Sequence, residues 1–116
     1  MEKKTLIRKC DVLFSKFIRK KGYCEFKGLD FNTCEGELEC CHIFSRGNKK
    51  LRHDIQNALC LCHAHHFYYT NHPSEWTEIV RKNFPEDYDY LIENRNKIQK
   101  PNYEEVYKWL NTLYEI

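Results

Sequence analysis

The sequence has 116 residues, of which 31% are charged and 15% aromatic, and its formal net charge is +2 at pH 7. A chain of this length has room for one domain with one modest core. No segment approaches the roughly eighteen apolar residues that a membrane span needs. The N-terminal stretch is charged and amphipathic and has no continuous apolar run, so we expect neither a secretory signal nor a membrane-spanning segment.

The charge is distributed unevenly along the chain. Residues 1–52 carry 13 basic and 7 acidic side chains, whereas residues 53–116 carry 6 basic and 10 acidic ones. The front half is therefore at +6 and the back half at −4. This asymmetry fits one face turned toward a polyanion such as nucleic acid, and it fits two ordinary solvated helix surfaces equally well.

The seven cysteines favour a reducing compartment. Because nothing in the sequence resembles a secretory signal, we expect thiols or thiolates in a reducing cytoplasm rather than disulfides, and the odd number of cysteines fits this expectation. We therefore expect a cytoplasmic protein, located in the host cytoplasm if the chain is phage-encoded.

The first predicted element is a basic amphipathic helix over residues 2–20, with Gly22 as a stop signal after it. Its apolar side chains recur at helical spacing along one stripe, and lysines and arginines occupy the other faces. We expect this helix to cover the core, and the same basic surface is able to lie along a phosphate backbone. The stripe consists of Leu6, Ile7, Cys10, Leu13, Phe14, Phe17 and Ile18.

Two short strands are predicted next, over residues 37–43 and 55–61, after a loop or loose hairpin over residues 23–36. The loop between the strands runs from Ser45 to Asp54 and is basic. A short helix is expected to begin near His63 and to continue through the aromatic residues that follow. The basic residues of the loop are Arg46, Lys49, Lys50 and Arg52.

Three further helices are predicted in the C-terminal part. Ser74 is the expected N-cap of the first, and Pro85 opens the second. Asn102, with Glu105 three residues later, resembles a capping box for the third. The residues expected to be buried on these helices are Trp76, Ile79, Val80, Phe84, Tyr88, Leu91, Ile92, Val106, Trp109, Leu110 and Leu113.

Most of the metal-ligating residue types lie in the middle of the chain. Six of the seven cysteines and five of the six histidines fall between Cys24 and Thr70. So small a chain rarely concentrates sulfur and nitrogen ligands in this way without a metal, and small domains often need such a staple. The sequence therefore predicts a metal-stabilised core.

Residues 37–70 resemble the HNH endonucleases, whose core is a ββα-metal fold, and in particular the branch found in phage and mobile-element proteins. His42 ends the first predicted strand, and Asn57 follows it by fifteen residues. His66 comes at the start of the predicted helix, after the knuckle that begins at Cys62, and an Arg-x-Asp stretch begins at Arg52. The ordered set is far more specific than any one of its letters.

The resemblance implies a metal-dependent phosphodiesterase. A neutral histidine at the end of a strand suits a general base, and this role falls to His42. His66 is then a ligand of a divalent ion, Mg²⁺ or Mn²⁺, and Asn57 either ligates the ion or pins the loop that orients His42. Contacts to DNA phosphates are expected from Arg46, Lys49, Lys50 and Arg52.

Two positions depart from the family pattern. Cys41 stands where the family usually has an aspartate or histidine ligand, and a thiolate suits Zn²⁺ better than Mg²⁺. Thr70 stands where another histidine is frequent. The catalytic ion is then expected to recruit Asp54 or His72, or to rely on Asn57 and the substrate phosphate, and the sequence leaves this choice open.

The resemblance also implies a structural zinc between two Cys-x-x-Cys knuckles. Cys62 and His65 form the second knuckle. The first is broken, because Lys27 stands where its second cysteine should be, and Cys34 is the expected substitute. The predicted zinc ligands are Cys24, Cys34, Cys62 and His65, with Cys40 and Cys60 as rivals.

We therefore predict an α+β fold with a ββα-metal (His-Me finger) core over residues 22–72. The N-terminal helix 2–20 and a C-terminal helical part 74–115 flank this core in a single domain, 1–116. The predicted function is hydrolysis of DNA phosphodiester bonds; the alternatives are a phage-type recombination or junction-resolving nuclease, and a catalytically decayed zinc-stabilised nucleic-acid-binding module. DNA is the expected partner and a membrane is not, while a homodimer and a phage packaging or recombination partner stay open.

Overall fold

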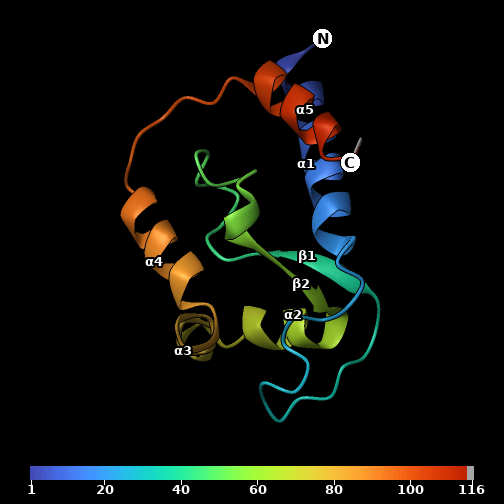
Figure 1. Ribbon diagram of the computed structural model, residues 1–116, viewed down its shortest axis with the longest axis vertical. Helices are drawn as coiled ribbons and strands as arrows, with labels where there is room; N and C mark the ends of the chain where they lie inside the picture. The colour runs from blue at the N-terminus through green and yellow to red at the C-terminus, as the bar shows by residue number, and fades with distance from the viewer. Residues whose placement is uncertain (115–116) are drawn as a thin grey trace.

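The computed structural model describes residues 1–114, so residue 115 of the predicted C-terminal helical part lies outside the described residues. It is an α+β structure, as predicted, with a two-stranded antiparallel hairpin compatible with a small ββα-metal core (Figure 1). None of the helices within residues 1–114 is long and apolar enough to cross a membrane. In chain order the elements are α1 (Lys3–Arg19), β1 (Leu38–His42), the 3-10 turn η1 (Ile55–Asn57), β2 (Ala58–Cys62), α2 (His63–Thr70), α3 (Pro73–Asn83), α4 (Pro85–Asn94) and α5 (Tyr103–Thr112).

The hairpin pairs β1 with β2 so that Cys40 lies opposite Cys60 and His42 opposite Ala58. All five residues of β2 are buried, because helices cover both faces of this strand. The second predicted strand begins three residues later than expected. The carboxylate of Asp54 accepts a hydrogen bond from the backbone N–H of Gln56, and this cap starts a 3-10 turn where the sequence had predicted extended chain.

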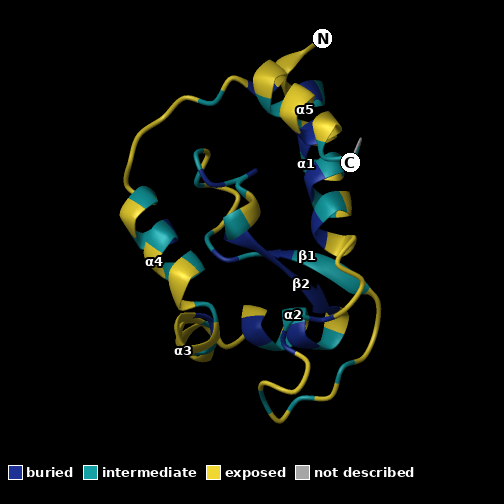
Figure 2. Cartoon of the chain, viewed as in Figure 1, coloured by how far each residue is buried: buried dark blue, intermediate teal, exposed yellow. Residues whose placement is uncertain are grey.

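Two apolar clusters share the hairpin, whose strand β2 is coloured as buried in Figure 2. One lies on the side of α2, α3 and α4 and includes Phe26, Leu51 and Leu61. The other lies between the hairpin, α1 and α5, where α1 buries every fourth residue from Leu6 to Ile18. Because successive residues of a strand point to opposite faces, β2 contributes alternately to the two clusters from Ala58 to Leu61.

The helix starts follow the proline and asparagine signals. α3 begins at Pro73 after His72, one residue before the predicted cap Ser74, since proline is well suited to the first helical position. Asn102 caps α5 by accepting hydrogen bonds from the N–H groups of Glu104 and Glu105. Trp109 was expected to be buried but is 39% exposed, because α5 packs on α1 through the face that carries Leu110.

Candidate metal centre and active site

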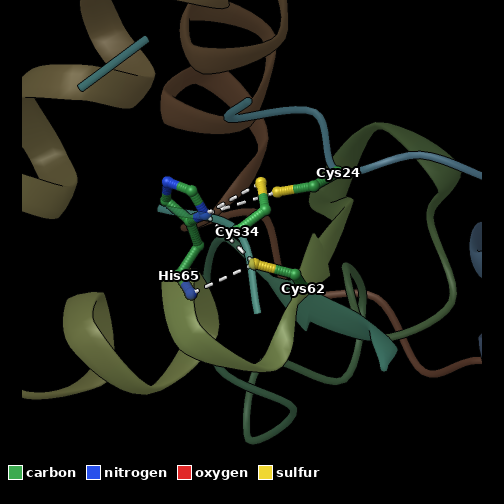
Figure 3. A group of neighbouring side chains, drawn as sticks. All are labelled: Cys24, Cys34, Cys62 and His65. Carbon is green, nitrogen blue, oxygen red and sulfur yellow. Dashed lines mark hydrogen bonds between the residues drawn. The ribbon is translucent and has the colours of Figure 1, made fainter. Parts of the chain in front are cut away.

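Four side chains that are far apart in the sequence meet beside the start of α2 (Figure 3). They are Cys24, Cys34, Cys62 and His65, the set expected for structural zinc, and their ligand atoms all lie within 4.8 Å of one another. The Nδ1 atom of His65 is 3.6, 3.7 and 3.1 Å from the sulfurs of Cys24, Cys34 and Cys62. Zinc–sulfur and zinc–nitrogen bonds at tetrahedral angles place such atoms about 3.6 Å apart, so the donor set fits a tetrahedral zinc ion.

The chemistry of the cluster also fits a cation. One imidazole nitrogen faces three sulfurs, more than its single lone pair or proton can serve by hydrogen bonding. Burial and the neighbouring sulfurs of Cys24 and Cys62 raise the pKa of the Cys34 thiol to about 12. As thiolates, three sulfurs this close together would need the charge of a metal ion beside them, and four Cys/His ligands with no open position are typical of a structural site.

The surrounding backbone and side chains hold the cluster in place. The N–H of His63 donates to the carbonyl of Glu37, which fixes the loop from Cys34 against the start of α2. Gly36 has φ +85° and a Cβ atom there would lie 2.7 Å from the Cβ of His63, so only glycine fits this crossing. On the far side of the ring, Nε2 of His65 donates to Asp30 at 2.9 Å, the carboxylate–histidine arrangement that orients metal ligands.

The other cysteines have different surroundings. Cys40 and Cys60 pair across the hairpin and lie outside the four-ligand cluster. Cys10 is fully buried on α1 as a packing residue. Cys41 is 6% exposed, and burial raises the pKa of its thiol to about 12, so it stays protonated at neutral pH.

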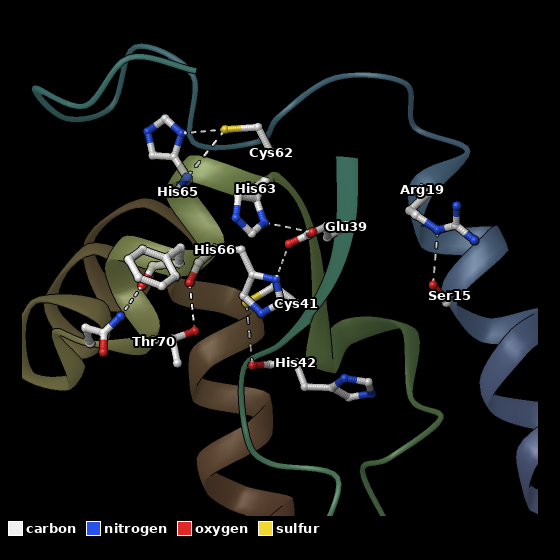
Figure 4. Close-up of polar contacts among 12 residues, drawn as sticks. Ser15, Arg19, Glu39, Cys41, His42, Cys62, His63, His65, His66 and Thr70 are labelled. Atoms are coloured by element: carbon white, nitrogen blue, oxygen red, sulfur yellow. Dashed lines mark hydrogen bonds and ion pairs between the residues drawn. The ribbon is translucent and has the colours of Figure 1, made fainter. Parts of the chain in front are cut away.

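His42 and His66 line the same surface hollow. This hollow, of about 380 Å³, is bordered by Asp11 and Ser15 of α1, by Cys40 and His42 of β1, by Arg46, and by His66 of α2. A second hollow is also lined by both histidines. The end of β1 and the first turn of α2 thus bring together two imidazoles that are twenty-four positions apart (Figure 4).

The ring of His42 has a defined proton arrangement. Its Nε2 lies 2.9 Å from the backbone carbonyl of Arg52, and because a carbonyl only accepts, Nε2 carries the proton. Nδ1 is therefore the unprotonated nitrogen of the neutral ring. Burial lowers the pKa of His42 below its ordinary value, although the hydrogen bond to Arg52 opposes this shift. A neutral, half-buried imidazole with one free nitrogen is suited to accept a proton from water.

Asn57 is completely buried, and its amide group is used within the protein. Its oxygen accepts from the N–H of Phe44, while its NH₂ group donates to the carbonyls of Phe44 and Leu51. These contacts join the two ends of the basic loop beside the carbonyl that holds His42. Of the two roles left open by the sequence, this geometry supports loop pinning.

A carboxylate that the sequence reasoning did not single out lies beside His66. Nδ1 of His66 donates to one oxygen of Glu39 at 2.8 Å, and Nδ1 of His63 donates to the other at 3.0 Å (Figure 4). Burial opposes the charge of Glu39, but these two hydrogen bonds keep its pKa below the ordinary value. With its Nδ1 proton fixed in this way, His66 has Nε2 left as a metal-ligating atom.

The other candidate ligands are engaged elsewhere. The carboxylate of Asp54 caps η1 and accepts the Tyr90 hydroxyl at 2.5 Å. The ring of His72 stacks on Tyr68 with centroids 4.0 Å apart. Thr70 donates its hydroxyl to the backbone carbonyl of His66, one turn earlier in α2.

The basic loop divides into three environments. Arg46 is exposed at the rim of the hollow that contains His42. Lys49 and Lys50 line a separate hollow of about 410 Å³ against α5. The guanidinium of Arg52 is directed inward and is bound by Asp11 of α1 at 2.6 and 2.9 Å.

Glu39, Asp30 and Asp11 were missed by the sequence reasoning. A period-two reading places Glu39 on the same face of the strand as Cys41, which was a usable signal for a group facing α2. Asp30 lies within the predicted loop over residues 23–36, and no local pattern connects it or Asp11 to histidines more than thirty residues away.

Comparison with known proteins agrees with this arrangement. Residues 24–73 match the family model described as HNH endonuclease, which confirms the resemblance of this segment to the HNH endonucleases. No curated protein and no solved structure matches the chain. The matched segment contains the metal cluster, both strands, the basic loop and α2, whereas α1, α4 and α5 lie outside it.

Proposed function

We propose that this chain, which carries an HNH endonuclease segment over residues 24–73, is an active nuclease that hydrolyses DNA phosphodiester bonds. The observation that carries the proposal is the shared hollow of His42 and His66, since hydrolysis needs a base and a divalent-ion ligand beside one phosphate. Family members generally act on DNA and use divalent metals.

In this mechanism His42 takes a proton from the attacking water through Nδ1, while the Arg52 carbonyl holds its Nε2–H. Asn57 keeps the loop that contains this carbonyl in place. Arg46, at the rim, is suited to bind a phosphate oxygen beside the scissile bond. Because His42 is held before substrate arrives, little reorganisation is needed during the reaction.

His66 is the proposed ligand of the catalytic ion through Nε2, with Glu39 orienting its ring. When bound there, a divalent ion would supply charge stabilisation for the phosphate and the leaving oxygen. An imidazole ligand favours Mn²⁺, Zn²⁺ or a similar transition metal over Mg²⁺. Cys41 is outside the proposed ligand set because its thiol is buried and stays protonated.

The second proposed metal is a structural zinc held by Cys24, Cys34, Cys62 and His65. Bound by these four residues, zinc would fix the first turn of α2, and hence His66, relative to the hairpin. The seven cysteines are all unpaired, which supports function in a reducing compartment such as the cytoplasm.

The decisive experiment measures cleavage of a supercoiled plasmid, a linear duplex and a four-way junction with Mg²⁺, Mn²⁺ or Zn²⁺. Cleavage that requires the ion supports the proposal, and strong preference for the junction would identify a junction-resolving nuclease. Binding to DNA in EDTA without cleavage in any metal would instead favour a decayed nucleic-acid-binding module.

A further inference from the structure

The aspartate on the N-terminal helix is connected to the proposed general base by an unbroken chain of contacts. One carboxylate, that of Asp11, receives Arg52 in a bidentate pair at 2.9 and 2.6 Å. The same carboxylate accepts from Nε2 of the buried His53 at 2.7 Å. The backbone carbonyl of Arg52 then accepts the Nε2 proton of His42 at 2.9 Å.

The burial and charge of Asp11 suit it to hold Arg52, and with it the basic loop, in one position. Its side chain is 19% exposed and that of Arg52 is 22% exposed, so the pair is shielded from most solvent. Bidentate arginine–carboxylate pairs hold both orientation and distance, unlike a flexible surface ion pair. Arg46 approaches the same carboxylate only to 3.8 Å and stays largely exposed, so it remains free for another anion.

The same helix also holds the ring of His42 directly. The ring of Phe14, one turn after Asp11, lies 5.4 Å from the ring of His42 and 5.8 Å from that of His53. Helical residues three apart share a face, so one face of α1 fixes both the ring of His42 and the loop carbonyl that binds it. Asn57 provides the second anchor of that loop, through Leu51.

We propose that Asp11 is a positioning residue for the general base: by clamping Arg52, it places the carbonyl that holds the Nε2 proton of His42. This inference rests on the proposed role of His42 in catalysis. It extends the active site to α1, which lies outside the segment that matches the family model. Arg52 then acts mainly within the protein, and Arg46 is the phosphate contact of this rim.

The test compares the full-length Asp11→Asn variant with the wild type by two measurements. The first is the exchange with water of the His42 Nε2–H proton, followed by NMR and assigned with His42→Ala. Loss of the bidentate Asp11–Arg52 pair is expected to speed this exchange by about tenfold or more, because the hydrogen bond from His42 to the carbonyl of Arg52 is released. The second is the single-turnover cleavage rate, expected to fall about 10- to 100-fold, the range seen when a carboxylate that orients a metal-bound histidine is removed.

A matched control is Asp87→Asn. Asp87 accepts a hydrogen bond from the side chain of Gln56, just after the loop, at 3.2 Å, but it forms no hydrogen bond or ion pair with Arg52 or His42. Proton exchange and cleavage should therefore be unchanged in this variant. If Asp11→Asn, folded by circular dichroism, leaves both measurements at wild-type values, the inference is wrong.

Arg52→Lys gives an independent route if Asp11→Asn does not fold. Lysine keeps the charge and the backbone carbonyl but loses the bidentate pair, so the same acceleration of exchange is expected. In the double variant Asp11→Asn/Arg52→Lys, the effects of the two substitutions on proton exchange and cleavage should not add, since both substitutions break the same Asp11–Arg52 pair. Unchanged proton exchange in Arg52→Lys, or additive losses, would overturn the clamp. Because the proton measurement does not require cleavage, failure of the nuclease proposal and failure of this inference are distinguishable.

Discussion

His42 and His66 belong to one hollow but are expected to fail in different ways when they are replaced. His42→Ala removes the proton acceptor, and general-base catalysis contributes about 10²–10⁴-fold, so a loss of that order in single-turnover cleavage is expected. His66→Ala weakens binding of the divalent ion instead. Excess Mn²⁺ should therefore restore part of the cleavage activity of His66→Ala but none of the activity of His42→Ala.

The matched control for these two variants is His72→Ala, because His72 is exposed and stacks on Tyr68 away from the hollow. Its cleavage rate should equal that of the wild type. DNA binding measured in EDTA should be the same for all three variants. Wild-type cleavage by folded His42→Ala would remove this histidine from the mechanism.

The cysteines provide a second comparison at the scale of single residues. Cys34→Ser should lose zinc and much of the melting temperature, because structural zinc contributes apparent binding free energy on the order of 10 kcal/mol, comparable with the whole stability of a small domain. Cys40→Ser is the matched control, since Cys40 lies across from Cys60 outside the cluster. Elemental analysis and thermal unfolding distinguish the two; a full zinc complement in Cys34→Ser would exclude Cys34 as a ligand.

Sequence reasoning was most informative where ligand type and spacing carry chemistry. It selected His65 and the three cysteines that the fold brings around it, including Cys34, which no regular knuckle contains. It did not find Glu39 or Asp11, because carboxylates are common on surfaces and only the packing of α1 and α2 on the hairpin reveals their histidine partners. The roles of the site residues in catalysis remain predictions for the experiments above.

At the scale of elements, the basic loop between the strands should bind DNA through Lys49 and Lys50. Replacing both lysines with glutamate should weaken binding to all DNA sequences alike and reduce the slope of log affinity against log salt by about two, one for each lost phosphate contact. The same double change at Lys3 and Lys4, exposed at the start of α1, is the matched control. Fluorescence anisotropy at several salt concentrations measures both; equal effects would indicate general charge repulsion rather than a loop-specific contact.

Helices and strands were predicted from their periodicity and caps. The errors occur where a local hydrogen bond changes the backbone conformation, or where a helix packs on its neighbour through only part of its apolar face. The strand expected from residue 55 begins at Ala58 because Asp54 caps a turn before it. Trp109 fits a helical stripe but remains partly exposed because α5 contacts α1 along a narrow face. Neither effect is visible in apolar spacing alone.

For the whole molecule, removal of zinc should affect the two apolar clusters unequally. Cys24 and Cys62 belong to the cluster on the side of α2, whereas the α1–α5 cluster contains none of the four zinc ligands. In a strong chelator, hydrogen exchange should therefore accelerate first in residues 24–36 and α2, and later in α1. Simultaneous exposure of all elements would show instead that the shared hairpin couples the clusters into one unit.

The pairing of α1 with α5 joins segments that are about a hundred residues apart: the Tyr114 hydroxyl donates to the carbonyl of Leu13, and the Cys10 thiol donates to that of Tyr103. Contacts of such long range form late. During synthesis, α1 cannot pack against α5 until α5 has left the ribosome. The zinc ligands are complete once His65 has emerged, but the helix that carries Asp11 and Phe14 is then still uncovered. A nascent chain halted before α5 should therefore hold zinc and leave DNA uncut, which delays nuclease activity until translation has passed that helix.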